Sequence, residues 1–165
     1  MPNDIQVRAV GPGDERILAY LCADIQALHV RAQPDVFKEV DLDGLEQWFR
    51  VVLAEASAEG WLGYVGEQAV GYALVRKERR PANVFCHERR WHEIDQIGVR
   101  ADFQGRGIAR HLLQRVADSA AAQGVFELEL NTWYFNERAQ TAFSKLGFSV
   151  KTVRFHRKVE YFDPY

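Results

Sequence analysis

The chain has 165 residues, of which 47% are hydrophobic and 27% are charged, and its 21 basic and 23 acidic side chains give a formal net charge of -2. This length and composition exclude a disordered chain and predict a single domain over residues 1–165. The balanced charge gives no electrostatic reason to expect a nucleic acid or a membrane as a partner. No apolar run approaches the ~20 residues needed to span a bilayer and no export signal begins the chain, so we expect a soluble, cytoplasmic protein.

The first part of the chain predicts a strand followed by two helices. Alternation at residues 5–9 predicts the strand, and apolar residues at helical spacing predict helices capped by Asp14 and by Asp43. The segment 29–37 between the helices is expected to be a loop, since Pro34 disfavours helix in the residue before it.

The middle of the chain predicts a pair of strands and a charged loop. Residues 61–65 and 70–75 have the composition of paired strands, and a tight turn at residues 66–68 would join them. The stretch 76–90 is rich in charge and contains a proline, so we expect it to be a loop.

The last part of the chain alternates strands and helices. The predicted elements are a strand at 91–99, a helix at 105–123, a strand at 125–131, a helix at 136–146 that Gly147 ends, and a final extended segment at 150–161. The whole order is mixed α and β around one sheet.

The most informative segment is the turn that leads from the strand at 91–99 into the next helix. Gly105 and Gly107 remove side chains where the helix starts, and bare N–H groups at a helix start form a site for phosphate oxygens. Arg106 and Arg110 add positive charge beside them. The alternative is that the two glycines only make a tight turn.

Two better-known phosphate loops do not fit this turn. The P-loop needs Lys followed by Ser or Thr where this chain has Ile108 and Ala109, and the dinucleotide fingerprint needs a glycine in place of Arg110. The segment resembles instead the acyl-CoA loop of the GCN5-related N-acetyltransferase (GNAT) superfamily. Its pattern is Gln or Arg, two residues, Gly, one residue, then Gly or Ala, and Gln104, Gly107 and Ala109 occupy those positions.

A second match to the same superfamily follows downstream. GNAT proteins commonly carry an Asn, an Ala three residues on, an aromatic residue and a closing Gly-Phe in one helix, here Asn136, Ala139, Phe143, Gly147 and Phe148. The upstream elements also follow the order of the family, so the resemblance covers nearly the whole chain. It implies an α/β GNAT fold: a mostly antiparallel, twisted central sheet of about six to seven strands, splayed between the fourth and fifth strands and flanked by four helices.

The resemblance also implies acetyl-CoA as co-substrate, and no metal. The pantetheine arm would lie in the splay and bond to the strand at Ile97 and Val99, and the pyrophosphate would rest on the amides from Gly105 to Ala109. The cofactor-binding residues expected on this basis are Ile97, Gly98, Val99, Gln104, Gly105, Arg106, Gly107, Ile108, Ala109, Arg110, Asn136 and Phe143.

Acetyl transfer needs a base, because a free alkylamine has a pKa of ~10.4 and is protonated at neutral pH. Glu93 lies at the offset from Gln104 where many GNAT enzymes hold their general base, and Asp95 would share its face in an unbulged strand, roughly 7 Å away. The backbone N–H of Ile97 is the usual oxyanion donor of the family. The alternative is that both carboxylates are solvated charges at a sheet edge.

The chain departs from the family pattern at Phe143, where many members have a tyrosine that protonates the coenzyme A thiolate. Phenylalanine has no proton to donate. Ser144, Tyr134 and Asn136 are nearby in sequence and are candidates for this role. Alternatively the thiolate leaves unprotonated, since a thiol has a pKa of ~8.5.

The acceptor pocket of this family lies between the first helices and the loops after the strands. We expect aromatic residues there, since rings beside Glu93 would suit a cationic amine. The substrate-binding candidates are His29, Phe37, Trp91 and Trp133, and Trp48, Tyr72 and Tyr134 are further rings of the same kind. A zinc site at Cys86, His87, His92 and Glu93 is not expected, because their spacing matches no standard ligand set.

Three functions stay open at this point. The first is acetyl transfer to a small cationic amine, with Glu93 or Asp95 as general base. The second is acetyl transfer to a protein or peptide, and the third is an acyl-CoA-binding module without turnover. A homodimer is also left open as a partner.

Overall fold

The computed structural model describes residues 4–159 of the chain. Their contacts divide the chain into two compact units, Met1–Asn131 and Thr132–Tyr165. A single domain over residues 1–165 stays a prediction. None of the helices in the described part of the chain is long and apolar enough to cross a membrane.

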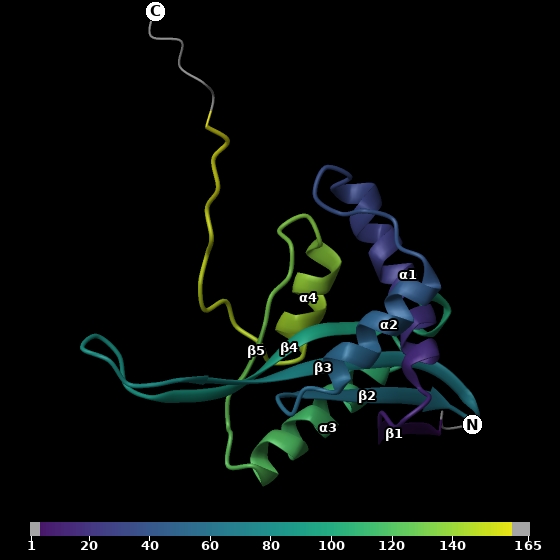
Figure 1. Cartoon of the computed structure of the whole chain (residues 1–165), viewed down its shortest axis with the longest axis horizontal. Coiled ribbons are helices and arrows are strands. Elements are labelled where there is room, and N and C mark those ends of the chain that lie inside the picture. Colours follow the sequence, from purple (N-terminus) through teal and green to yellow (C-terminus); the bar gives the residue numbers. More distant parts are fainter. Residues whose placement is uncertain (1–3, 160–165) are drawn as a thin grey trace, which may run out of the picture. The chain divides into compact units, whose positions relative to one another are not determined.

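Within residues 4–159 the first unit contains one five-stranded sheet in the order β1-β2-β3-β4-β5 (Figure 1). The neighbouring strands up to β4 pair antiparallel, and β4 pairs with β5 in parallel. The mostly antiparallel sheet is confirmed, with five strands in the described residues where we expected six or seven. The strands are β1 (Ile5–Ala9), β2 (Ala58–Val65), β3 (Gln68–Arg80), β4 (Arg89–Val99) and β5 (Leu128–Leu130).

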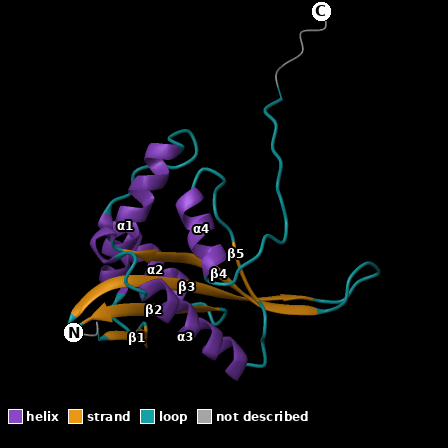
Figure 2. Cartoon of the chain, turned by 180° about the vertical axis from the view of Figure 1, so that it is seen from behind, coloured by secondary structure: helices purple, strands orange, loops and turns teal. Residues whose placement is uncertain are grey.

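Helices cover both faces of this sheet (Figure 2). On one face, α1 (Glu15–Ala32) and α2 (Leu42–Leu53) enclose the main core, and on the other lies α3 (Ile108–Ala122). α3 packs closely because Gly71 of β3 has no side chain: a Cβ there would lie 3.0 Å from Ile108. The buried residues of the main core are Leu18, Leu21, Cys22, Phe49, Val52, Leu62, Tyr72 and Leu74.

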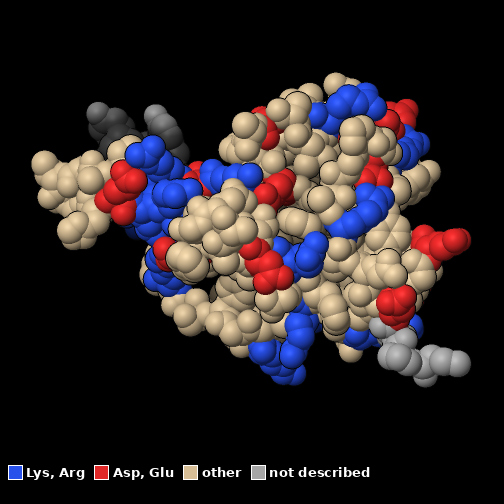
Figure 3. All heavy atoms as spheres, turned by 90° about the horizontal axis from the view of Figure 1, so that it is seen from below, with Lys and Arg blue, Asp and Glu red and all other residues tan. Residues whose placement is uncertain are grey.

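The predicted loop at 76–90 is wrong at its two ends, 76–80 and 89–90, which are strand, and residues 81–88 connect them. β3 continues to Arg80 and β4 begins at Arg89, so the two strands form a long hairpin that extends beyond the rest of the sheet (Figure 1). Lys and Arg side chains gather along this hairpin behind its tip (Figure 3). The apolar alternation that marks a half-buried strand is absent from an exposed ribbon, and this explains why the sequence pattern did not reveal it.

The helix boundaries differ from the prediction at three places. α3 begins at Ile108, where we expected a helix from residue 105. α1 includes residues 29–32, which we expected in a loop, and ends just before Pro34. Asp41 rather than Asp43 caps α2: its side chain accepts a hydrogen bond of 2.7 Å from the backbone N–H of Gly44. Asp14 stands at the N-cap of α1, but its carboxylate makes no cap bond to the helix.

The second unit contains α4 (Glu137–Lys145), close to the predicted helix. The side chain of Asn136 caps this helix by accepting a hydrogen bond of 3.2 Å from the backbone N–H of Ala139. Gly147 follows the helix with a φ of 93°, as a C-terminal cap requires. Residues 150–159 form no strand, and the rest of the predicted segment 150–161 lies outside the described residues.

Candidate active site

The predicted splay between the fourth and fifth strands is present. β5 pairs with β4 only from His92 to Ile94, whereas β4 continues to Val99. In the described residues of the sheet, the stretch 95–99 therefore has β3 on one side and no strand on the other. An extended ligand with amide groups can bond to a strand edge of this kind.

β4 is not regular between its two acidic residues. In the register with β3, Ile94 and Gln96 pair with consecutive residues of that strand, so Asp95 has no partner. A bulge of this type interrupts the alternation of side chains, so the unbulged strand on which the predicted common face of Glu93 and Asp95 depended is not present. Asp95 is exposed.

The carboxylate of Glu93 is held by two donors. The side-chain amide of Asn131 donates to Oε1 at 2.8 Å, and the indole N–H of Trp91 donates to Oε2 at 3.2 Å. Asn131 follows β5 and Trp91 precedes Glu93 on β4, so the end of the parallel pair fixes this side chain. Trp91 thus contacts the predicted base, and its predicted contact with the substrate stays a prediction.

Burial raises the pKa of Glu93 above its ordinary value, and the indole N–H of Trp91 opposes this rise. The negative charges of Glu129, Asp95 and Glu78 raise it further. Glu129 faces Glu93 directly across the parallel ladder. A carboxylate with a raised pKa, held in place at the splay, has the properties of a general base.

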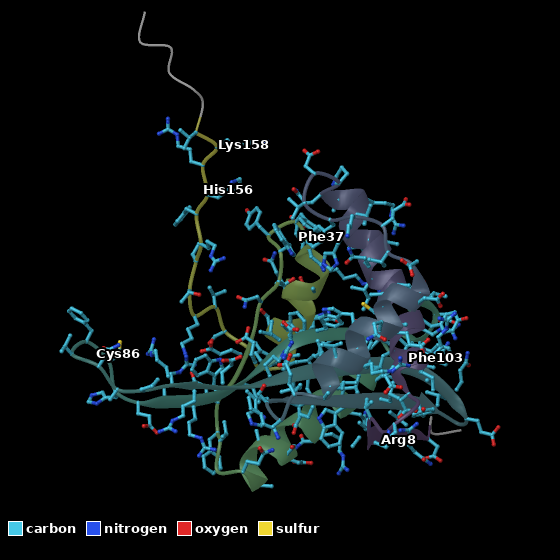
Figure 4. The ribbon with its side chains drawn as sticks, in the orientation of Figure 1. Arg8, Phe37, Cys86, Phe103, His156 and Lys158 are labelled. Atoms are coloured by element: carbon cyan, nitrogen blue, oxygen red, sulfur yellow. The ribbon has the colours of Figure 1, made fainter. Side chains whose placement is uncertain are left out.

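The turn after β4 contains a short 3₁₀ helix, η1 (Ala101–Phe103), and then the two glycines. Gly105 and Gly107 have φ angles of 78° and 88°, which favour glycine, and Gly107 is the N-cap of α3. Figure 4 shows Phe103 in this turn at one end of the sheet and Cys86 in the β3–β4 hairpin at the other. The turn thus lies at the end of β4 where the strand has lost its β5 neighbour.

The amides of this turn are not used by the protein. Within residues 4–159, no backbone or side-chain acceptor takes a hydrogen bond from the N–H groups of residues 105–109. Residues 104–107 are also exposed. A row of exposed, unpaired amides at the start of a helix is suited to bind the oxygens of a phosphate group.

The side chains of the turn brace it. The amide of Gln104 donates to the carbonyl oxygen of Val99 at 2.9 Å, and Arg106 donates to the carbonyl oxygen of Asp102 at 2.9 Å. The guanidinium of Arg106 also lies 4.8 Å from the ring centre of Phe103. Gln104, which marks the family pattern, therefore ties the loop to the end of β4 in this structure.

Gly98 has a structural role of its own. A Cβ at this position would lie 1.8 Å from Cδ1 of Ile25 in α1 and 3.1 Å from the ring of Tyr72. The glycine lets α1 pack closely over β4 beside the splay. The preceding residue of β4, Ile97, pairs with Ala73 of β3. The role of its backbone N–H as oxyanion donor stays a prediction.

The predicted acceptor residues fall in both units. In the first unit, the rings of His29 and Phe37 lie 4.9 Å apart, and burial lowers the pKa of His29. In the second unit, Trp133 stacks on Phe135 at 5.9 Å. Tyr72 is 1% exposed and belongs to the core, so of the candidate rings it is one that does not line an open pocket.

The predicted thiolate side of the site lies in the second unit. The ring of Phe143 packs against Phe148 at 6.0 Å, and the backbone oxygen of Ser144 accepts a hydrogen bond from Gly147. The backbone oxygen of Tyr134 accepts one from the side chain of Gln140. The proposed proton donors Tyr134 and Ser144 stay predictions.

Asn131 is the residue near the predicted base that the sequence analysis missed. It matches no motif, and its place depends on the register of β5 with β4. The nearest signal is that Asn131 follows a predicted strand in the splayed pair. In the described residues, no group of three or more His, Cys, Asp or Glu side chains is placed to hold a metal ion.

Comparison with known proteins agrees with this geometry. The model of the Acetyltransferase (GNAT) family matches residues 22–148. The chain is 30% identical over 102 residues to a [ribosomal protein bS18]-alanine N-acetyltransferase of Salmonella typhimurium, a match that covers 59% of this chain and 67% of the relative.

Two solved structures are similar over almost the whole chain. A tetramutant of the BH1408 protein of Bacillus halodurans matches with a TM-score of 0.87 and 20% identity, covering 93% of this chain and 99% of that one. The aminoglycoside N-acetyltransferase AAC(6')-Iy in complex with CoA matches with a TM-score of 0.74 and 19% identity, covering 93% and 94%. At these identities the two structures show a shared fold.

Proposed function

Since the chain belongs to the GNAT family of acetyltransferases, we propose that it transfers the acetyl group of acetyl-CoA to a primary amine, with Glu93 as general base. The observation that carries the proposal is the Glu93 carboxylate, which two donors hold beside the unpaired stretch of β4. The exposed amides at the other end of that stretch support the binding of a CoA diphosphate.

The residues of the chain fit acetyl-CoA in two places. The amides of residues 105–109 would take the diphosphate oxygens, and the backbone of Ile97 and Val99 would bond to the pantetheine amides. The positive side chains of Arg106 and Arg110 would add attraction for phosphate. Both sites lie along one continuous strand and turn, as one extended molecule requires.

In the proposed reaction, Glu93 takes the proton that the amine loses as it attacks the acetyl carbon. The new C–N bond forms, the C–S bond breaks, and the electron pair of that bond leaves with the CoA sulfur. The backbone N–H of Ile97 would stabilise the oxyanion between these two steps. The thiolate then leaves as such or takes a proton from Tyr134 or Ser144.

We propose a small cationic amine as acceptor. The acidic residues Glu93 and Asp95 beside the splay would attract a positive charge, and a similar structure is that of an aminoglycoside N-acetyltransferase. His29 in the last turn of α1 and Phe37 in the segment between α1 and α2 lie close together and would contribute aromatic contacts. The alternative acceptor is a peptide N-terminus, which the relative named as an alanine N-acetyltransferase favours.

The proposal includes a cytoplasmic location and leaves a homodimer open. Cys22 and Cys86 are free thiols, as a reducing compartment allows. Light scattering at several concentrations would measure the oligomeric state.

Cofactor binding is tested by a matched pair of variants at Gly107. Both Asp and Asn tolerate the positive φ of this residue better than other side chains, so Gly107→Asp and Gly107→Asn share a similar strain. Gly107→Asp adds a carboxylate beside the diphosphate and should weaken acetyl-CoA binding tenfold or more beyond the effect of Gly107→Asn, by roughly 1.4 kcal/mol. Calorimetry measures both affinities, and equal affinities would contradict the loop assignment.

The acceptor is tested by thiol release from acetyl-CoA with a panel of amines and a peptide that begins with alanine. Faster release with small diamines or amino sugars supports the proposed acceptor class, and faster release with the peptide supports the alternative. Tight acetyl-CoA binding without release from any acceptor would favour the binding module instead.

A further inference from the structure

The bulge at Asp95 changes the direction of the next side chain of β4. Glu93 pairs with Arg76 and Gln96 pairs with Leu74. Because Arg76 and Leu74 are two residues apart on β3, their side chains and those of their partners project from one face of the sheet. In a regular strand, two residues three apart would point to opposite faces. The bulge therefore places Gln96 on the same face as Glu93.

The carbonyl end of the Gln96 side chain is anchored from the core. The hydroxyl of Tyr72 donates to its Oε1 at 2.9 Å, and the thiol of Cys22 donates to the same oxygen at 3.7 Å. Tyr72 is 1% exposed and Cys22 is 7% exposed. Two buried donors, one from β3 and one from α1, thus fix which end of this amide faces the protein.

The nitrogen end of the same amide has no protein partner. Across the described residues, 4–159, no acceptor takes a hydrogen bond from Nε2 of Gln96, and this atom is not among the fully buried polar atoms without partners. The residue is half-buried. Two N–H donors are therefore presented next to Ile97, where β4 has lost its β5 neighbour.

We propose that Gln96 is a specificity-determining residue of the acceptor site, which donates from Nε2 to an oxygen atom of the amine substrate. The inference rests on the proposed acetyl transfer with Glu93 as base. The β3 partners of Glu93 and Gln96 are two residues apart, which separates the two side chains by roughly 7 Å. An acceptor that meets both residues carries a hydroxyl or carbonyl oxygen a few bonds from its reacting amine, as amino alcohols and amino-acid amides do.

Two variants separate the donor from the rest of the side chain. Gln96→Glu keeps an oxygen for Tyr72 and Cys22 but replaces the two N–H donors by an acceptor. Gln96→Met keeps the length and loses the polar atoms. Gln68→Glu makes the same chemical change at an exposed position at the start of β3 and serves as the control for added charge.

The test compares matched amines of nearly equal shape: 2-aminoethanol with propylamine, and glycinamide with isobutylamine. The wild-type protein should favour the oxygen-bearing member of each pair by roughly three- to tenfold, mainly through KM. Gln96→Glu and Gln96→Met should bring this ratio close to one without changing KM for acetyl-CoA, and Gln68→Glu should keep it. Circular dichroism checks that each variant is folded.

Unchanged ratios in a folded Gln96 variant, with an active wild-type protein, would overturn the role of Gln96 and leave acetyl transfer intact. A wild-type protein that releases no thiol with any amine or peptide would overturn the acetyl transfer and this inference with it. The two failures are thus distinguished by the activity of the wild-type protein alone.

Discussion

Glu93 illustrates how the ends of two strands can prepare one carboxylate for proton transfer. Asn131 and Trp91 each donate to a different oxygen, so the side chain has little freedom to turn. Burial and the facing Glu129 raise its pKa, which brings the base closer to the pH at which it would work. Asn131 and Trp91 therefore set the orientation of the Glu93 side chain, whereas burial and Glu129 raise its proton affinity.

Glu93→Gln should lower kcat/KM at neutral pH by roughly a hundredfold or more, because it removes the base, and its amide oxygen can accept from only one of the two donors, Asn131 and Trp91. For the wild-type protein, the rate should fall as the pH drops through the raised pKa of Glu93, since only the carboxylate accepts a proton. The profile of the variant should lack this acid limb. Its rate should recover in part as the pH approaches the pKa of a free alkylamine, ~10.4, because more of the amine is then neutral. A pH profile of kcat/KM measures both effects.

Asp95→Asn is the control for this experiment, because Asp95 is exposed at the bulge and is the other acidic residue of the strand. It should change the rate much less than Glu93→Gln. The assignment of the base would be wrong if the two variants exchanged these outcomes, or if Glu93→Gln kept the acid limb of the wild-type profile.

The sequence could predict part of this site. Glu93 and the glycine turn follow from short motifs at fixed offsets along one segment of the chain, so local pattern was sufficient. Asn131 and Gln96 could not be found in this way, because their positions depend on the parallel register of β4 with β5 and on a bulge that no local pattern marks.

At the scale of the elements, the start of α2 depends on one side chain. Asp41 accepts a hydrogen bond from Gly44, and the helix that it begins buries Phe49 and Val52 in the core. Asp41→Ala should therefore lower the free energy of unfolding by about 1 kcal/mol. Urea denaturation of the two proteins measures this difference.

Asp43 provides the comparison, because it lies in the first turn of the same helix and was the cap that we expected from sequence. Its side chain is 90% exposed and pairs with Arg16 at the surface. Asp43→Ala should cost less than Asp41→Ala, since surface ion pairs contribute about 0–1 kcal/mol. The reverse order of the two costs would contradict the observed cap.

The elements that the sequence predicted well are those with an apolar face. α3 and α4 have the expected positions because apolar spacing and a closing glycine mark their ends. The outer part of the β3–β4 hairpin was missed because it is an exposed ribbon of charged residues, in which pairing depends on the partner strand. The cap of α2 was misplaced by two residues because several acidic residues precede that helix.

At the scale of the whole molecule, the buried ionisable groups have opposite effects on stability. The folded state holds the proton of Glu93 more tightly than the unfolded chain, so this group removes stability as the pH rises above its ordinary pKa of 4.5. Asp14 has its pKa lowered by Arg8, so it loses its contribution only as the pH falls below about 3.8. The proposed catalytic base thus costs stability at neutral pH, and the ion pair of Asp14 with Arg8 does not.

The buried ring of His92 makes stability depend on pH just below neutrality, as His29 with its lowered pKa also does. His92 is 1% exposed, and burial lowers its pKa below the ordinary 6.5; the charge of Glu59 opposes this shift, and those of Lys77 and Arg90 add to it. The unfolded chain takes up this proton first, so the wild-type protein should lose stability relative to His92→Gln as the pH falls from about 7 to about 5. Urea denaturation at several pH values measures the difference.

His87→Gln, a change in the exposed hairpin tip, is the control and should keep the pH dependence of the wild-type protein. Parallel stability curves for the wild-type protein and His92→Gln would show that the buried ring of His92 does not cause the loss of stability at low pH.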